Sequence, residues 1–293
     1  MKTSKLARAF QITHGKDFRL KNFDPADTGG VQSREKAEDL LQKNIDQLAD
    51  LQDKLYAQDQ WAILLMFQAM DAAGKDGAIK HVMSGVNPQG VQVYSFKQPS
   101  AEELNHDLMW RAARCLPERG RIGIFNRSYY EEVLVVRVHQ QFLTRQHLPS
   151  ELISKDIWRE RMADMCNFEH YLTRNGIVVR KFFLHVSKEE QKRRFLKRLE
   201  EPEKNWKFSE ADVQERQYFD DYMDAYEDMI RHTATPHAPW YVVPADQKWF
   251  TRLVVGSAIV ETLKELKLSY PKVDAEKRKA LAAARVKLEK EKT

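Results

Sequence analysis

The residues best suited to chemistry in this chain lie between positions 69 and 77, directly after an apolar run. Gly74 and Lys75 match the end of the phosphate-binding pattern G-x-x-x-x-G-K-[ST], whereas Ala69 replaces its first glycine and Asp76 replaces its Ser or Thr. Backbone N–H groups at the start of a helix attract anions, and a lysine adds a positive charge for phosphate oxygens. The segment therefore predicts phosphate contacts from Ala72, Ala73, Gly74, Lys75, Asp76 and Gly77.

Two carboxylates flank the Gly-Lys pair. Asp71 and Asp76 repel a bare phosphate, but they suit a phosphate that is bridged to the protein by Mg²⁺. We therefore expect a divalent cation, Mg²⁺ or in its place Mn²⁺, with Asp71 as a ligand. The alternative is an ordinary turn from strand to helix that carries a surface lysine.

A second polar group follows another apolar segment, in Phe125-Asn126-Arg127-Ser128-Tyr129-Tyr130-Glu131. In phosphate-loop enzymes, a strand beside the loop strand often ends in a carboxylate that organises the metal. Asn126 occupies that place here, which makes it a second candidate for the metal site. Arg127 can clamp a phosphate with two parallel hydrogen bonds, and Glu131 lies one turn later. The alternative is a plain helix start with Ser128 near its cap.

Positive charge is concentrated in residues 191–198, where five of eight residues are Lys or Arg. Arg194 and Arg198 are four positions apart and share a helix face, which suits a polyanion or a developing phosphoryl charge. Lys207, slightly further on, is another candidate for phosphate binding. Arg137 follows an apolar run, so it either points into a phosphate channel or pairs with a carboxylate. The alternative for 191–198 is a solvated helix balanced by the acidic residues that follow it.

These residues must be positioned by strands that alternate with helices. Apolar or alternating segments predict five strands at 62–67, 91–96, 121–125, 177–186 and 240–243. Helical patterns or caps lie before and between them, at 34–59, 77–86, near 101, from 128, at 151–174, from 188, at 209–232 and at 249–267. This alternation predicts an α/β fold with a five-stranded parallel sheet covered by helices on both faces. Ligands of such sheets bind at the carboxyl ends of the strands.

Several of these segments together resemble the family-2 polyphosphate kinases. The motifs are Asp-Ala-Ala-Gly-Lys-Asp-Gly at 71–77, Phe-Asn-Arg-Ser-Tyr-Tyr-Glu-Glu-Val at 125–133, Ser-Phe-Lys-Gln-Pro-Ser at 95–100, Trp-Lys-Phe at 206–208 and Ala-Pro-Trp-Tyr-Val-Val-Pro-Ala at 238–245. The resemblance extends over about residues 15–270. It implies a P-loop kinase fold that moves phosphate between inorganic polyphosphate and nucleotides with Mg²⁺, and it places 187–208 in a helical lid.

The resemblance also implies roles for individual residues. Many members have Asp at the position of Asn126, and the Asn-Arg-Ser-x-Tyr-Glu form resembles the class that accepts AMP as well as ADP. Asp71, Lys75, Asn126, Arg127 and Glu131 are then the catalytic candidates, and Glu131 is expected to influence acceptor choice. ATP is expected as a third nucleotide partner beside AMP and ADP, and GMP, GDP and GTP are alternative partners. We also expect a dimer or tetramer of identical chains.

Two other functions fit parts of this pattern. An ATP-dependent nucleotide kinase would share the fold and differ in its phosphoryl donor. A non-catalytic protein that binds RNA or polyphosphate would show salt-sensitive binding without turnover. Ala69, Asp76 and the many cations beyond the loop favour a longer polyanion as donor, and we expect no nucleic-acid partner.

Composition and charge limit the classes of protein to which this chain can belong. Of 293 residues 31% are charged, and the longest dense apolar run, 62–67, is far shorter than the ~20 residues of a membrane-spanning helix. Residues 1–20 and 271–293 each carry a net charge of +4, so the part between them carries −3 of the total +5. We therefore expect an N-terminal arm at 1–33, a kinase domain at 34–270 and a charged tail at 271–293. Two cysteines without metal-ligand spacing and no apolar leader predict a cytoplasmic protein.

Overall fold

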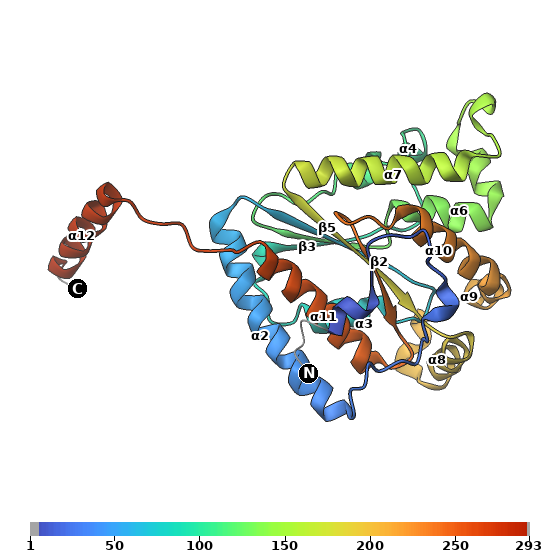
Figure 1. Ribbon diagram of the computed structural model, residues 1–293, viewed down its shortest axis with the longest axis horizontal. Helices are drawn as coiled ribbons and strands as arrows, with labels where there is room; N and C mark the ends of the chain where they lie inside the picture. The colour runs from blue at the N-terminus through green and yellow to red at the C-terminus, as the bar shows by residue number, and fades with distance from the viewer. Residues whose placement is uncertain (1–5, 292–293) are drawn as a thin grey trace.

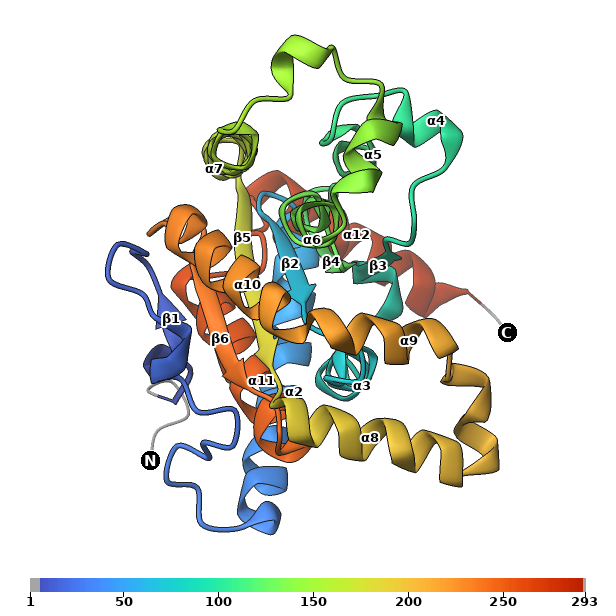
Figure 2. The same cartoon turned by 90° about the vertical axis from the view of Figure 1, so that its right-hand side faces the viewer.

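One six-stranded sheet organises the protein, whose computed structural model describes residues 6–291 apart from the side chain of Lys207. The strand order is β1-β6-β5-β2-β4-β3; β5, β2 and β3 are labelled in Figure 1, and the whole order can be followed in Figure 2. The five predicted parallel strands are confirmed as β2 (Ala62–Gln68), β3 (Val91–Ser95), β4 (Ile122–Asn126), β5 (Ile177–His185) and β6 (Trp240–Pro244). The sixth strand, β1 (Gln11–Ile12), pairs antiparallel with β6. Its two residues are too few for alternation to be visible in the sequence, so the predicted count of five was too low.

The central strand β2 is buried along its whole length. It pairs with β4 on one side and β5 on the other, which explains why it is apolar on both faces. Phe67 is in register with Asn126 of β4 and with Phe182 of β5. The segments that follow β2 and β4 therefore leave the sheet side by side, at the edge where ligands of parallel sheets bind.

Helices cover both faces of the sheet, as predicted. Figure 1 shows α7 (Ile157–Arg174) and α6 (Val135–Val138) on one side and α2 (Arg34–Gln58) and α11 (Lys248–Glu265) on the other. Helix α2 begins at a cap where Ser33 accepts a hydrogen bond from the Lys36 N–H, and its buried stripe, including Leu41, Leu48 and Leu55, packs on α11. The remaining helices on these faces are α3 (Lys75–Val82) and α10 (Phe219–Thr233). Shorter helices are α4 (Ala101–Leu104), α5 (Trp110–Ala113), η3 (Pro88–Gly90), η5 (Gln140–Gln146) and η6 (Ser150–Leu152).

Three predicted helices differ in the structure. The helix expected from 128 is the 3₁₀ turn η4 (Tyr129–Val133), and the one expected at 151–174 begins only at Ile157. The helix expected at 209–232 is divided into α9 (Glu210–Glu215), η8 (Arg216–Tyr218) and α10. At this break Arg216 donates to the Lys188 carbonyl and to the Gln191 side chain, which ties η8 to residues 188–191.

The segment expected to be a lid projects beyond the sheet. It consists of α8 (Lys188–Glu200) and η7 (Pro202–Lys207), and α9 follows it in the chain. Figure 2 shows α8 on one side of the projection and α9 on the other, with α3 beside them. Because α3 begins at Lys75, the projection lies next to the predicted phosphate loop.

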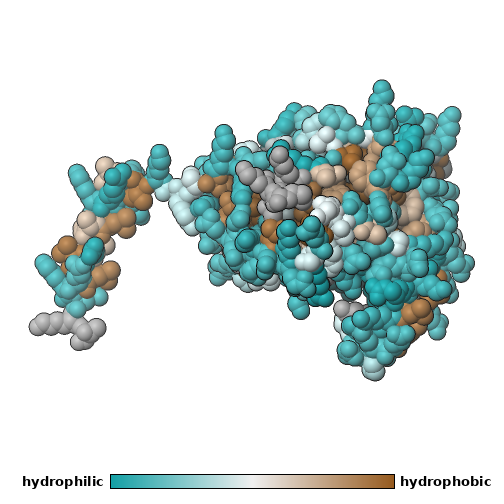
Figure 3. All heavy atoms as spheres, turned by 60° about the horizontal axis from the view of Figure 1, so that its bottom comes forward, coloured by the Kyte–Doolittle hydropathy of each residue, from teal (hydrophilic) through white to brown (hydrophobic). Residues whose placement is uncertain are grey.

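The two ends of the chain differ in how they pack. The N-terminal segment forms η1 (Ala7–Phe10), β1 and η2 (Leu20–Asn22), and it buries Leu6, Phe10 and Phe18 against the body. At the other end, α12 (Ala275–Lys290) has no buried residue and stands clear of the body (Figure 3). Within residues 6–291, no helix combines the length and the apolar character needed to cross a bilayer.

Candidate phosphoryl-transfer site

The predicted phosphate loop connects β2 to α3. Gly74 caps the helix with φ +107°, a conformation that L side chains rarely adopt, and Ala72 is also left-handed with φ +63°. Lys75 is the first residue of α3, and its Nζ donates to the Ala69 carbonyl at 2.8 Å. Burial, with Arg127 nearby, lowers the pKa of Lys75 to about 8. An anion bound at this helix start would offset both effects.

Side chains of α8 hold the backbone of this loop. Gln191 donates to the Asp71 carbonyl at 2.9 Å, and Arg194 donates to the carbonyls of Ala72 and Ala73 at 3.0 and 2.6 Å. All five N–H groups of a guanidinium can be satisfied by protein acceptors, and Arg194 also bonds the carbonyls of Ala245 and Asp246 and the carboxylate of Glu190. Arg194 thus joins the loop, α8 and the segment after β6, although it was expected to contact phosphate.

The turn after β4 faces the phosphate loop. Arg127 forms ion pairs with Asp71 at 2.6 Å and with Glu131 at 3.1 Å. Asn126 donates its amide to Asp76 at 2.7 Å. The structure thus brings Asp71, Asp76, Asn126, Arg127 and Glu131 together from two strand ends, as the sequence predicted. Arg127 has φ +65°, so backbone strain is present in both segments.

The charges in this cluster stabilise one another. Burial opposes ionisation of Asp71, but Arg127 and Lys75 nevertheless keep the pKa of that carboxyl below its usual value. Glu131 raises the pKa of Arg127 against the effect of burial. Asp71 therefore has a protein counter-ion in Arg127, which the sequence argument for a bridging cation did not include.

The oxygen ligands at this place are suited to a cation that also binds phosphate. Among residues 6–291, no group of three or more His, Cys, Asp or Glu side chains is arranged to hold a metal by itself. Mg²⁺ in kinases is usually held by one or two protein oxygens, substrate phosphates and water. The Asp71 carboxylate and the amide oxygen of Asn126, whose nitrogen faces Asp76, fit that type of site.

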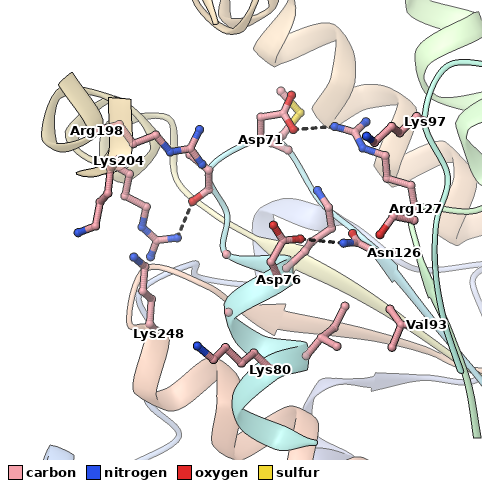
Figure 4. A pocket seen from close by; sticks show the side chains of 18 of the residues that line it. Asp71, Asp76, Lys80, Val93, Lys97, Asn126, Arg127, Arg198, Lys204 and Lys248 are labelled. Atoms are coloured by element: carbon pink, nitrogen blue, oxygen red, sulfur yellow. Dashed lines mark hydrogen bonds and ion pairs between the residues drawn. The ribbon is translucent and has the colours of Figure 1, made fainter. Parts of the chain in front are cut away.

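A cavity of about 780 Å³ opens above the phosphate loop. In Figure 4, Arg198, Lys204 and Lys248 lie on one side of Asp71 and Asp76, with Arg127 on the other. The cavity is lined by two carboxylates and by nine basic residues, namely Lys75, Lys80, Lys97, Arg127, Arg194, Lys197, Arg198, Lys204 and Lys248. A cavity with this excess of positive charge is suited to a polyanion.

None of Lys80, Lys97, Lys204 and Lys248 was named as a site residue from the sequence, and Lys197 was included only as one of the basic residues of 191–198. Lys97 and Lys248 come soon after the ends of β3 and β6, so their position at strand ends was a usable signal. Burial, with Arg194 nearby, lowers the pKa of Lys248 to about 8. Lys80 and Lys204 lie on helices among other charged residues, where the sequence does not distinguish a lining residue from a solvated one.

A second cavity, of about 430 Å³, lies against the first. Its lining combines apolar or uncharged side chains with six charged ones. The first group is Phe96, Gln98, Pro99, Leu104, Val135, Val136, Phe142 and Gln146, and the second is Lys97, Arg111, Arg127, Arg145, Glu131 and Glu132. Phe96, Lys97 and Arg127 line both cavities. The two spaces therefore meet at Arg127, beside Asp71.

Two predicted phosphate ligands lie elsewhere. Arg137 forms an ion pair with Asp228 of α10 at 2.5 Å and is not among the residues lining either cavity, so it has the second of its two expected roles. Lys207 lies in η7, but its side chain is outside what the structure describes. Arg198 does line the basic cavity, with Asp212 of α9 at 3.6 Å.

Comparisons with known proteins agree with this geometry. A sequence model of the Polyphosphate kinase 2 family, PPK2, matches residues 31–271. The ADP-polyphosphate phosphotransferase of Rhodopseudomonas palustris is 52% identical over 282 residues, which cover 96% of this chain and 98% of that protein. The AMP/ADP-polyphosphate phosphotransferase of Meiothermus ruber is 44% identical over 258 residues, which cover 87% and 91%. The crystal structure of polyphosphate kinase 2 from Arthrobacter aurescens TC1 has a TM-score of 0.86 and 38% identity, and the match covers 95% of this chain and 96% of that one.

Proposed function

Because this chain belongs to the polyphosphate kinase 2 family and has its P-loop kinase fold, we propose that it transfers phosphoryl groups from inorganic polyphosphate to AMP and ADP. The observation that carries the proposal is the pair of cavities that meet at Arg127. The first is strongly basic, and the second combines an apolar wall with acidic and basic side chains, as a polyanionic donor and a nucleotide acceptor require.

Polyphosphate would occupy the basic cavity. Its terminal phosphoryl group would lie at the start of α3, where Lys75 and the backbone N–H groups of the loop favour negative charge. The rest of the chain would extend past Arg198, Lys204 and Lys248. These cations come from three separate elements, and several positive charges suit a repeated phosphate better than the base and sugar of a nucleoside triphosphate.

The acceptor nucleotide would occupy the second cavity. Its apolar walls suit a base and ribose, and Glu131 and Arg127 stand at the side facing the donor. The acceptor phosphate would then face the donor phosphoryl group across Arg127, and the guanidinium would stabilise charge on the group in transfer. Phosphoryl transfer needs little covalent chemistry from the protein. The site would therefore act by positioning the two substrates and by electrostatic stabilisation of the group in transfer.

A divalent cation is a general requirement of phosphoryl-transfer kinases, and we propose Mg²⁺ here. Asp71 and Asn126 would hold it. When bound, it would neutralise charge on the donor phosphates and allow the approach of a second anion. Arg127 remains within reach of Asp71 and keeps that carboxylate ionised.

The range of acceptors is the finer part of the proposal. The two curated relatives are named for different ranges, ADP in one case and AMP with ADP in the other. We favour both acceptors because the neutral Asn126 removes one negative charge beside the acceptor phosphate, while Glu131 stands in the acceptor cavity. A GDP-polyphosphate phosphotransferase of Pseudomonas aeruginosa is 35% identical over 210 residues, so guanine nucleotides belong in the same assay.

A comparison of donors tests the proposal directly. Purified protein with Mg²⁺ is given ADP and polyphosphate, with no other nucleotide, and ATP formation is followed. The same protein is given AMP with ATP as the only donor. We expect rapid ATP formation from polyphosphate. Turnover with ATP and none with polyphosphate would instead make the chain an ATP-dependent nucleotide kinase.

A further inference from the structure

A buried ion pair lies behind the acceptor side of the site and is not used by the mechanism above. Lys181 of β5 and Glu169 of α7 are both inaccessible to solvent, with Nζ and Oε2 2.6 Å apart. Lys181 also donates to the Tyr130 hydroxyl at 3.0 Å and to the Thr233 carbonyl at 2.8 Å. All three of its N–H groups therefore have acceptors.

The other end of this cluster is the turn η4. The hydroxyls of Tyr129 and Tyr130 both donate to Oε1 of Glu169, at 2.9 and 2.7 Å. Burial and the nearby Glu169 raise the pKa of both phenols, so both keep the protons that they donate. The same turn contains Glu131 and begins just after Arg127, which form the ion pair that faces the acceptor cavity.

Stability alone does not explain a charged pair at this place. Removing two charges from water is costly, and well-packed apolar residues in place of a buried ion pair are often equally stable or more so. What the pair adds is direction, because Lys181 and Glu169 fix two tyrosine hydroxyls at defined points. Arg127 has φ +65°, and a strained residue persists only where its surroundings hold it.

We propose that Lys181, Glu169, Tyr129 and Tyr130 form a positioning network that fixes η4 so that Arg127 and Glu131 meet the acceptor phosphate beside Asp71. The four residues do not line either cavity, so their effect is transmitted through the turn. This inference rests on the proposed function for its readout, since positioning is measured here as transfer to AMP and ADP.

The residue directly before Lys181, Arg180, provides a control. Arg180 of β5 is also buried and cationic, and it bonds Thr262 at 3.0 Å and Glu265 at 3.2 Å, both on α11. Successive residues of a strand face opposite sides of a sheet, so Arg180 holds the face away from η4. Arg180→Met and changes at Lys181 thus each remove a buried cation, on opposite faces of the sheet, although the Glu265 partner of Arg180 is 53% exposed and the Glu169 partner of Lys181 is fully buried.

Two variants of different severity test the network. Tyr130→Phe removes one hydroxyl and leaves the ring, whereas the double variant Lys181→Met with Glu169→Leu removes both charges without leaving either one unpaired. We expect kcat to fall about 3- to 10-fold in the first and about 10- to 100-fold in the second, with KM for polyphosphate unchanged and a changed ratio of kcat/KM for AMP over ADP. Arg180→Met should keep kcat and this ratio within about twofold of wild type.

The melting temperature of every variant separates an effect on positioning from a loss of fold. If the double variant is unfolded, Tyr130→Phe alone tests the network. Folded variants with wild-type kcat and acceptor ratio would show that the cluster only fills the core. An equal loss in Arg180→Met would show that the effect is general destabilisation. Absence of turnover in the wild-type protein would instead contradict the proposed function and not the network.

Discussion

The donor and acceptor cavities are adjacent but are built in different ways. The donor cavity receives long basic side chains from α3, α8, η7, α11 and the segment after β3, and most of its lining charge is positive. The acceptor cavity is enclosed by η4, α6, η5 and the segment after β3, and Glu132 in its lining forms a buried ion pair with Arg161 at 3.0 Å. The first arrangement suits a repetitive polyanion of variable length. The second suits one molecule in one orientation.

The strongest test of this difference is Lys75→Ala, because Lys75 lies where the transferred group would be. Losing one charge-assisted contact in the transition state costs about 3 kcal/mol, so kcat should fall about 10²-fold while the fold is kept. Lys80→Ala is the control, since it removes a cation from the same helix and the same cavity. It should change kcat only a few-fold. Equal rates for Lys75→Ala and wild type would remove the phosphate-loop assignment.

On the acceptor side the expected effect is smaller but selective. Glu131→Ala should lower kcat/KM for AMP about 10-fold more than for ADP, because AMP places its reacting oxygen one phosphate nearer the nucleoside and leaves more of the gap to be organised by the protein. The measurement is kcat/KM for both acceptors in both proteins at saturating Mg²⁺. An unchanged ratio of kcat/KM for AMP over ADP would show that Glu131 does not influence acceptor choice. The acceptor cavity would then be no more selective than the donor cavity.

Two arginines of α8 separate holding the loop from binding the donor. Arg194→Ala leaves several loop carbonyls without a donor and should lower both kcat and the melting temperature. Arg198→Ala should raise KM for polyphosphate several-fold and reduce its salt dependence by a slope of about 1, without a change in melting temperature. KM, salt slope and thermal unfolding of both variants check this pair. Identical behaviour of the two would place both arginines in the same role.

The smallest expected effect is a pH dependence of donor use. The pKa of Lys75 is lowered to about 8, so its positive charge is present below that pH and is lost as the pH rises through it. The value of kcat/KM, which reports the free enzyme, should therefore decline above about pH 8. Lys248 has a similarly lowered pKa, so the profile is repeated with Lys248→Arg, which stays charged. A profile that becomes flat in this variant would assign the decline to Lys248.

Much of the site was predictable because its residues follow strands directly. Asn126 and Arg127 are at and next to the end of β4, Asp71 lies in the loop after β2, and Lys75 begins the helix after that loop. The ends of parallel strands meet at one edge of a sheet. The five parallel strands were visible because four of them are buried and largely apolar, whereas the half-exposed β3 shows alternation instead.

Features that depend on tertiary contacts were not predictable. The type and spacing of Arg194 and Arg198 are consistent with one shared face, yet Arg194 is saturated by backbone carbonyls from two distant segments. Strand β1 exists because β6 offers it an edge, and its two residues carry no pattern of their own. The pairing of Lys181 with Glu169 joins a strand to a helix. Lys181 stands out among the apolar residues of β5, but the sequence does not show which acidic residue is its partner.

We propose that one site takes polyphosphate as donor and accepts both AMP and ADP. The most direct test is kcat/KM of the wild-type protein for each acceptor, with polyphosphate as the only donor, Mg²⁺ at saturation and products separated as ADP and ATP. We expect AMP to give ADP first and ATP later, and ADP to give ATP, with both acceptors used. ATP formation from ADP with no conversion of AMP would contradict the dual-acceptor site, and no product from either would contradict the account as a whole.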